Sequence, residues 1–352
     1  MEQNSSFTNL LILWYLKNKR DLPWRKTKNP YQIWLSEIIL QQTKISQGTA
    51  YYLKFIEKFP TIQNLASARE EDVLKLWQGL GYYSRARNLH KTAKHISNEL
   101  NGIFPKKYDD LIKLKGVGDY TASAIASICF NGPNATVDGN VYRLLSRYFG
   151  ISTPINSSKG IKEFKEIAQT LLNKKDSGTF NQAMMEFGAL VCTPKNPDCI
   201  HCTFNESCNA LQNNTVPILP VKENKIKIRK RYFNYLVVNF NNSQTIIQQR
   251  FGKGIWENLF EFPLLESEKE LEIKEIVNHE MLGQIIGTTS YHISKFNNTQ
   301  IIHKLSHQHL FTTFWIININ EPIKNAILWD NLSNFALPTL IQNFVDNYKK
   351  RD

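Results

Sequence analysis

The 352-residue chain lacks any apolar run long enough to cross a membrane. Its N-terminal apolar segment, LLILWYL at 10–16, is too short to span a bilayer and lacks the basic leader and small-residue cleavage site of a secretory signal. Internal repeats and low-complexity tracts are also absent from the sequence. We therefore expect a folded cytosolic protein, in which this segment forms a core-facing helix.

Cysteine is scarce, and its distribution is uneven. Four of the 5 cysteines fall in one short segment with the spacing Cys-x6-Cys-x2-Cys-x5-Cys, namely Cys192, Cys199, Cys202 and Cys208. In a cytosolic chain, such clustering indicates a metal site rather than disulfides. Four thiolates can hold one tetrahedral zinc ion or one cubane iron–sulfur cluster, and the spacing alone does not decide between them. The isolated Cys129 is expected to be a buried core thiol.

Acidic residues are outnumbered by basic ones. The chain has 31 Asp and Glu against 43 Lys and Arg, which gives a net charge of +12. A basic balance of this size points to a polyanionic partner such as nucleic acid, although a merely soluble basic protein is the alternative. Hydrophobic residues make up 42% of the chain, and its length suits two or three domains with a large core.

Hydrophobic periodicity divides the chain into two halves. Up to about residue 210, apolar residues recur at helical spacing, as in YQIWLSEIIL, VLKLWQGL and TASAIASICF. Residues 213–230 combine two prolines with a run rich in Lys and Arg, which predicts a linker. Beyond it, YFNYLVVNF, QTIIQQR and HLFTTFWIIN are typical of strands, and KELEIKEIVNHEML and ALPTLIQNFVDNY of helices. We expect a helical half followed by an α+β unit.

Two carboxylic acids are candidates for catalysis. Glu37 lies among apolar residues in WLSEIILQQT, so it either turns outward or occupies a dry site that raises its pKa and keeps it protonated near neutral pH. Asp138, in TVDGNVYR, lies in a polar turn just before a predicted helix, where it would cap the helix and stay ionised. Asn140 could cap that helix as well. One neutral and one charged carboxyl is the pattern of a glycoside-cleaving pair.

Two glycine turns are candidates for nucleic-acid contact. The turn in LKGVGDYTASA lies between two predicted helices, and its glycines would let backbone N–H groups approach a phosphate. GLGYYSRARN crowds tyrosines beside arginines, which suits stacking on unpaired bases, although a surface loop with packed aromatics is the alternative. The candidates are Gly116, Val117 and Gly118 in the first turn, and Tyr82, Arg85 and Arg87 in the second.

Together, WLSEIILQQT, GLGYYSRARN, LKGVGDYTA, VDGNVYR and the four-cysteine loop resemble the motifs of the MutY-type adenine DNA glycosylases, which belong to the endonuclease III-like helix-hairpin-helix superfamily. The resemblance covers most of residues 1–215, with the motifs in the family order. It implies a multidomain protein with an all-α glycosylase core. That core would comprise an iron–sulfur cluster domain (1–28 and 136–212) and a six-helix barrel domain with the helix-hairpin-helix (29–135). The four cysteines would then hold a [4Fe–4S] cluster rather than zinc.

The resemblance also implies a reaction. The enzyme would be a monofunctional glycosylase of base excision repair that removes adenine mispaired with 8-oxoguanine or guanine in double-stranded DNA. Glu37 would be the general acid at adenine N7, Asp138 would stabilise the oxocarbenium-like sugar, and Tyr120 and Asn140 would support them. Bifunctional members of the superfamily carry a lysine at the position of Tyr120. Tyrosine cannot form their Schiff base, which argues against an endonuclease III-like glycosylase/lyase for oxidised pyrimidines.

Further contacts follow from the same resemblance. The adenine pocket would be formed by Arg20, Leu22, Trp24, Arg25, Gln182 and Met185. Gln41, Gln42 and Tyr82 would wedge into the duplex and meet the lesion on the opposite strand. For Leu22 and Met185, core packing is nearly as good an interpretation.

Residues 231–352 resemble the Nudix-like domain that this family shares with 8-oxo-dGTP hydrolases, through RFGKGIWENLFEFP and HKLSHQH. Ser306 and His307 match the loop that recognises 8-oxoguanine, whereas Leu305 replaces the usual aromatic residue. The acidic Nudix box is absent, so we expect recognition without Mg²⁺-dependent hydrolysis. A nucleotide hydrolase with a DNA-binding half and a non-catalytic iron–sulfur protein are further alternatives. We expect a monomer in the cytoplasm, associated with the nucleoid if the source is bacterial; a partner such as a sliding clamp is not readable from the sequence.

Overall fold

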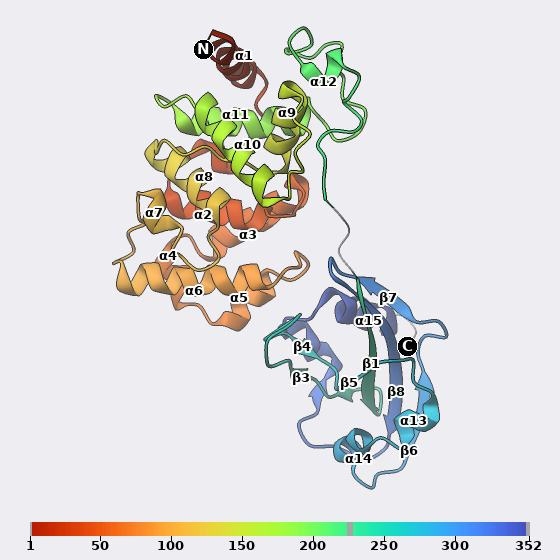
Figure 1. The fold of residues 1–352 in the computed structure, drawn as a ribbon. Coiled ribbons are helices and arrows are strands. Elements are labelled where there is room, and N and C mark those ends of the chain that lie inside the picture. The colour runs from red at the N-terminus through yellow and green to blue at the C-terminus, as the bar shows by residue number, and fades with distance from the viewer. Residues whose placement is uncertain (1, 224–227, 350–352) are drawn as a thin grey trace. The chain divides into compact units, whose positions relative to one another are not determined.

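The computed structural model describes residues 2–223 and 228–349, and Figure 1 shows the chain as a ribbon. The chain divides into two compact units, one made of Met1–Ser67 with Asn88–Asn224 and the other of Ala68–Arg87 with Lys225–Asp352. The prediction of an all-helical region followed by an α+β region is confirmed. Residues 224–227 of the predicted linker lie outside the described residues. The predicted boundaries inside the helical region, at 28/29 and 135/136, stay predictions.

The described part of the first unit is helical. Its elements are α1 (Glu2–Asn18), the 3-10 helix η1 (Pro23–Lys26), α2 (Pro30–Leu40), α3 (Ile45–Lys58), α4 (Ile62–Ser67), α6 (Ser84–Glu99), α7 (Tyr108–Leu111), α8 (Asp119–Phe130), α9 (Gly139–Phe149), α10 (Ser158–Leu171), α11 (Ser177–Leu190) and α12 (Asn209–Gln212). The first turn of α6 belongs to the second unit. These helices bring residues that are distant in the sequence to common cores.

Helix α2 is buried on nearly all sides. Asn29 caps its N-terminus by accepting from the backbone N–H of Tyr31, and Pro30 occupies the first turn, where its missing N–H costs nothing. The helix packs against α3, α8 and η1, and a helix that is apolar all round belongs in a core. A charged residue on α2 is therefore placed inside the protein.

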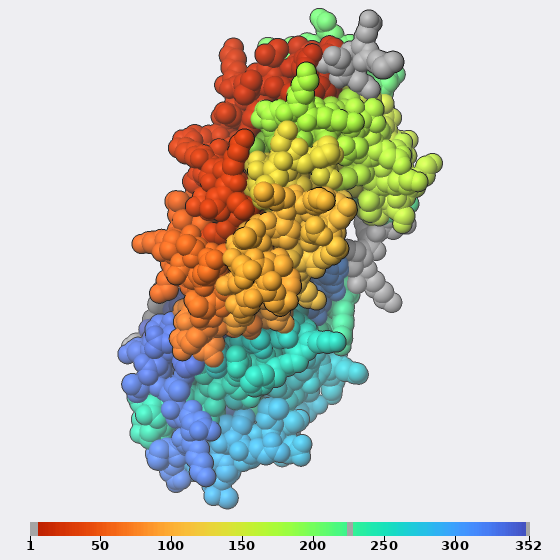
Figure 2. All heavy atoms as spheres, turned by 90° about the vertical axis from the view of Figure 1, so that its left-hand side faces the viewer, coloured from red at the N-terminus to blue at the C-terminus, as the bar shows by residue number. Residues whose placement is uncertain are grey.

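A second core joins the start of the chain to much later helices. Phe7 and Leu11 of α1 pack with Phe164 of α10 and with Phe180 and Phe187 of α11, and all five side chains are almost fully buried. In Figure 2 the red atoms of the N-terminal residues lie against the yellow-green atoms of these later helices. This packing holds the segment that follows α1 beside α11.

The predicted glycine hairpin connects α7 to α8. Gly116 has a φ of +77°, a conformation that favours glycine, and a Cβ built there would lie 2.7 Å from Cβ of Asn88. Val117 is buried and donates its N–H to the carbonyl of Leu114. Gly118 precedes the first residue of α8, Asp119. The hairpin therefore leaves the N-terminus of a twelve-residue helix at its end.

The second unit is built on a mixed sheet. Its strands are β1 (Arg229–Phe240), β2 (Gln244–Thr245), β5 (Leu264–Ser267), β6 (Tyr291–Lys295), β7 (Ile301–Lys304), β8 (Gln308–Ile319) and β9 (Ile327–Leu328), in the order β6-β8-β1-β2-β9, with β5 paired to β1 and β7 to β8. β3 (Gln248–Gln249) and β4 (Phe260–Glu261) form a separate pair. The other elements are α5 (Glu70–Leu76), α13 (Ile273–Val277), α14 (Glu280–Ile286), η2 (Trp329–Asn334) and α15 (Thr339–Tyr348).

Strands β1 and β8 run parallel, and the centre of each is buried on both faces. On one face, Phe344 of α15 stacks on Phe314 with 4.0 Å between the ring centroids. On the other face, Trp315 packs in a cluster with Ile276 of α13 and Leu282 of α14. Helices therefore cover the sheet on both sides.

Three sequence predictions need correction here. QTIIQQR forms two short strands in different sheets, and KELEIKEIVNHEML forms two helices because His279 caps a new helix by accepting from the N–H of Met281. Arg229 and Lys230, assigned to the linker, extend β1 because they pair with the start of β8. Among the described residues, we find no helix that is both long and apolar enough to cross a membrane.

Candidate active site

A cavity of about 210 Å³ in the first unit gathers the predicted site residues. Its walls come from η1, α2, α8, α11 and the N-terminus of α9. The four residues predicted to be catalytic and the six predicted to bind adenine all line it: Glu37, Tyr120, Asp138, Asn140, Arg20, Leu22, Trp24, Arg25, Gln182 and Met185. The structure thus brings all ten together, although their roles stay predictions.

Glu37 faces this cavity from α2 with only 8% of its surface exposed. Burial raises the pKa of its carboxyl to about 7, and the negative charge of Asp138 adds to that rise. A hydrogen bond with Tyr120 and the positive charge of Arg25 oppose the rise. The predicted dry carboxyl with a raised pKa is confirmed, and the interpretation of Glu37 as an outward-turned surface residue is wrong.

Asp138 caps α9, as predicted. Its Oδ1 accepts from the backbone N–H groups of Asn140 at 2.9 Å and Val141 at 2.8 Å, and its Oδ2 accepts from Nδ2 of Asn140 at 2.8 Å. The sequence predicted that Asp138 lies in a polar turn and stays ionised. In the structure, burial raises the pKa of its carboxyl, whereas the bonds from Val141 and Asn140 and the charge of Arg143 lower it. Three donors therefore stabilise the ionised form at a partly dry site.

Tyr120 connects the two sides of the cavity. Its hydroxyl donates to Sδ of Met185 at 3.0 Å and also makes a hydrogen bond with Glu37. Burial raises the pKa of Tyr120 well above its ordinary value, and the nearby carboxyls of Glu37 and Asp138 raise it further. The phenol therefore stays protonated and can donate a hydrogen bond.

Glu186 is a buried cavity residue that sequence reasoning missed. Its carboxylate accepts from Nε of Arg20 at 2.9 Å and from Nη1 and Nη2 of Arg25, both at 2.8 Å. Burial alone would raise its pKa, but the hydrogen bonds from the two arginines lower it to about 2. The available signal was an acid among apolar residues in AMMEFGAL, one helical turn after Gln182.

Arg143 is a second residue that sequence reasoning missed. Its Nη2 donates to Oδ1 of Asn140 at 2.9 Å, and its Nε donates to the carbonyl of Cys192 at 2.6 Å. Asn140 in turn donates to Asp138. A continuous chain of hydrogen bonds thus runs from the first cysteine of the cluster segment to the carboxylate of Asp138.

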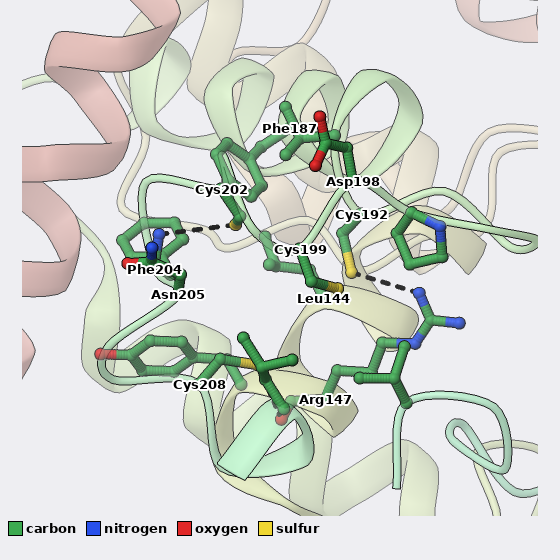
Figure 3. Close-up of a pocket in the computed structure, with 15 residues that line it drawn as sticks. Leu144, Arg147, Phe187, Cys192, Asp198, Cys199, Cys202, Phe204, Asn205 and Cys208 are labelled. Atoms are coloured by element: carbon green, nitrogen blue, oxygen red, sulfur yellow. Dashed lines mark hydrogen bonds between the residues drawn. The ribbon is translucent and has the colours of Figure 1, made fainter. Parts of the chain in front are cut away.

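The four clustered cysteines line one cavity. Figure 3 shows Cys192, Cys199, Cys202 and Cys208 around a common space, whose walls include the apolar side chains of Leu144, Phe187 and Phe204. Nη1 of Arg147 lies 3.5 Å from Sγ of Cys192, and the backbone N–H of Phe204 donates to Sγ of Cys202 at 3.4 Å. Within the described ranges, no group of three or more His, Cys, Asp or Glu is placed to hold a single metal ion.

The predicted DNA-contact residues of the first unit lie at helix ends. Gln41 is the C-cap of α2, and its Nε2 donates to Oγ1 of Thr121 at 3.3 Å. Gln42 follows with a φ of +54°. The hairpin residues Gly116 to Gly118 precede α8, with Val117 buried. The DNA-contact roles of these residues stay predictions.

The other predicted contact residues belong to the second unit. Tyr82 is 48% exposed, and its hydroxyl lies 2.6 Å from Oγ of Ser306 in a cavity of about 370 Å³ that Leu305 and His307 also line. Arg85 lies over the rings of Trp77 and Tyr82 and donates to the carbonyls of Leu80 and Gly81. Arg87 pairs with Glu257 at 2.9 Å. Both guanidinium groups are thus directed at protein acceptors.

Comparisons with known proteins agree with this geometry. Residues 35–170 match the HhH-GPD superfamily of base excision DNA repair proteins, and residues 234–347 match the NUDIX domain. Adenine DNA glycosylase from Buchnera aphidicola subsp. Baizongia pistaciae is 36% identical over 98% of this chain and 97% of its own length. The chain belongs to the adenine DNA glycosylase family. The rat adenine DNA glycosylase is 44% identical over 59% of this chain and 42% of its own length.

Solved structures of two other DNA repair enzymes resemble the helical part of the chain. A thermostable thymine-DNA glycosylase is 29% identical, with a TM-score of 0.56 over 60% of this chain and 98% of its own. Endonuclease III in a non-covalent complex with DNA, 21% identical with a TM-score of 0.53 over 60% of this chain and 97% of its own, shares the fold. The family identifies the chain as a base excision repair glycosylase, a hydrolase of N-glycosyl bonds that acts on DNA.

Proposed function

We propose that this glycosylase releases adenine mispaired with 8-oxoguanine or guanine in double-stranded DNA. The observation that carries the proposal is the pairing of Glu37, whose pKa is raised to about 7, with Asp138 at the wall of one cavity. Because a stacked base is out of reach, the adenine must first be flipped out of the duplex into that cavity. The names of the relatives support adenine as the base.

The two carboxyls take different roles. The raised pKa lets the Glu37 carboxyl carry a proton near neutral pH, and donation of this proton to N7 of adenine makes the base a better leaving group. Ionised Asp138, held by Asn140 and Val141, stabilises the positive charge that develops on the deoxyribose. Water then attacks the sugar and leaves an abasic site. Tyr120 orients Glu37 through their hydrogen bond.

The reaction stops at base release. A glycosylase/lyase needs an amine that attacks the sugar and forms a Schiff base. Among the described residues that line the cavity, none is a lysine. The resemblance to the superfamily implies that Tyr120 stands where its bifunctional members carry a lysine. Absence of a borohydride-trapped enzyme–DNA adduct is therefore expected.

We further infer that Cys192, Cys199, Cys202 and Cys208 hold a [4Fe–4S] cluster. Four thiols around one apolar cavity, with N–H donors directed at two of the sulfurs, form a donor set that fits the cluster. Bound there, the cluster would supply the cross-link that gives the cysteine segment its shape. Iron and acid-labile sulfide in a ratio near unity in the purified protein would support the inference, and stoichiometric zinc would contradict it.

Recognition of the opposite base is assigned to the second unit. Ser306 and His307 line one cavity with Tyr82, which supports a site for 8-oxoguanine there. The enzyme is proposed to act as a monomer in the cytoplasm, at the nucleoid if the source is bacterial.

The proposal is tested by single-turnover assays on duplexes with adenine opposite 8-oxoguanine, guanine, cytosine or thymine, followed by alkali to reveal abasic sites. We expect fast release opposite 8-oxoguanine and guanine. Release from none of the four duplexes would refute the proposed function. A duplex with an oxidised pyrimidine, assayed with borohydride, tests the lyase alternative in the same series.

A further inference from the structure

We propose that Glu186 is a positioning residue of the excision site: it holds Arg20 and Arg25 at the cavity wall and cancels one of their two charges, so that Glu37 keeps its proton. The inference rests on the proposed function, because it concerns how the acid of that reaction is maintained. Glu186 lies on α11, which the packing of α1 keeps beside the two arginines. Its side chain is almost completely buried.

The hydrogen bonds of Glu186 indicate that it positions other side chains and does not contact the base itself. Oε1 of Glu186 accepts from the backbone N–H and Nε of Arg20 and from Nη1 of Arg25, and Oε2 accepts from Nη2 of each arginine. An ionised carboxylate offers about four acceptor positions, so five donors leave none for the amino group of a purine. Glu186 therefore acts through the arginines.

The arginines are also linked to each other and to the rest of the cavity. Nη1 of Arg25 donates to the carbonyl of Arg20 at 3.1 Å, and its guanidinium lies 5.5 Å from the ring centroid of Tyr15. The hydroxyl of Tyr15 donates to Oε1 of Gln182 at 3.1 Å. Loss of Glu186 would release two forked contacts at once and leave two positive charges, the better buried one on Arg25, without their counter-ion.

The charge of Arg25 acts on Glu37 together with groups from the neighbouring elements. Tyr120 and Cys129 face it from α8, Asp138 from the start of α9, and Arg25 from η1; α3 contributes Tyr52, whose ring packs on Trp24. Of these, Asp138 favours the protonated form of Glu37 and Arg25 favours the ionised form. With Glu186 present, the two arginines amount to one net positive charge. Without it, both charges act, and Glu37 loses its proton at a lower pH.

The test is a charge series at one cavity wall. The group formed by Arg20, Arg25 and Glu186 carries one net positive charge in the natural protein. That net charge becomes two in Glu186→Gln and zero in Arg20→Gln. We expect the falling limb of the pH–rate profile for single-turnover excision to move down by about one pH unit in Glu186→Gln and up in Arg20→Gln. Glu166→Gln on the exposed surface of α10 is the matched control, expected to leave the limb in place.

A uniform loss of rate with no movement of the limb in either variant would overturn the proposal. If Glu186→Gln does not fold, Arg20→Gln decides alone, because this arginine is a third exposed and its loss is tolerated more easily. An independent readout is the carboxyl band of Glu37, titrated by infrared difference spectroscopy of each protein against its Glu37→Gln counterpart. If the natural protein releases no adenine, the proposed function fails, and the infrared titration still decides whether Glu186 sets the protonation of Glu37.

Discussion

Replacing Asp138 by asparagine or by alanine separates its two roles in the structure. Asparagine caps a helix about as well as aspartate, so Asp138→Asn keeps the bonds from the N–H groups of Asn140 and Val141. It loses the bond from Nδ2 of Asn140, because the amide nitrogen that replaces Oδ2 donates and cannot accept, and that bond is worth about 1 kcal/mol. It also removes a carboxyl whose pKa is raised by burial, and this offsets part of that loss. The free energy of unfolding of Asp138→Asn should therefore lie within about 1 kcal/mol of the natural protein.

Asp138→Ala loses the cap as well, and its free energy of unfolding should fall about 1 kcal/mol further, measured by urea unfolding. Both variants lack the charge that supports the sugar cation, so single-turnover excision should fall on the order of 10²-fold or more in each. Asp138→Asn that excises adenine at the natural rate would show that Asp138 is only a cap. Equal free energies of unfolding for the two variants would show that the side-chain cap at position 138 does not stabilise α9.

Three other predictions concern the acid, the hydrogen-bond chain and the hairpin. Excision should slow as the pH rises through about 7, because Glu37 must be protonated. The raised pKa also stabilises the folded state at pH values below the pKa of Glu37 in the unfolded chain, and this stabilisation is lost as the pH rises to about 7. Glu37→Gln should therefore remove roughly 3 kcal/mol from the pH dependence of the free energy of unfolding, measured with urea. Arg143→Lys should cut excision at least about tenfold by loosening Asn140 while iron content stays near that of the natural protein; an unchanged rate would exclude the chain from catalysis. Gly116→Ala should cost at least about 1 kcal/mol, because of its positive φ and the contact with Asn88, and should weaken DNA binding in a fluorescence titration; unchanged stability would contradict the strain.

The local sequence pattern predicted most of the features that depend on a single helix or turn. Glu37 stood out because its neighbours on α2 are apolar, and the helix that buries them buries it too. The capping role of Asp138 and the glycine hairpin were readable for the same reason, since each depends on residues within a few positions. The family relationship, predicted from five motifs, is confirmed by the comparisons.

Partners that are distant in the chain were not readable. Glu186 carries the same local signal as Glu37, but the arginines that hold it ionised lie more than 150 residues earlier, so its opposite pKa shift could not be predicted. The sequence also does not tell whether an arginine turns outward or, like Arg85, lies over aromatic rings inside the protein. Strand ends show the same limit, because Arg229 joins β1 only through its pairing with β8.

The most direct test of the account is single-turnover release of adenine opposite 8-oxoguanine by the natural protein and by Glu37→Gln, at pH values below and above 7. Glutamine keeps the shape of the side chain in its buried site but cannot donate the proton. We expect release by the natural protein that slows at the higher pH, and a loss on the order of 10²- to 10⁴-fold in Glu37→Gln with no remaining pH dependence from this group. Excision by Glu37→Gln at a rate comparable to that of the natural protein would contradict the assignment of Glu37 as the general acid.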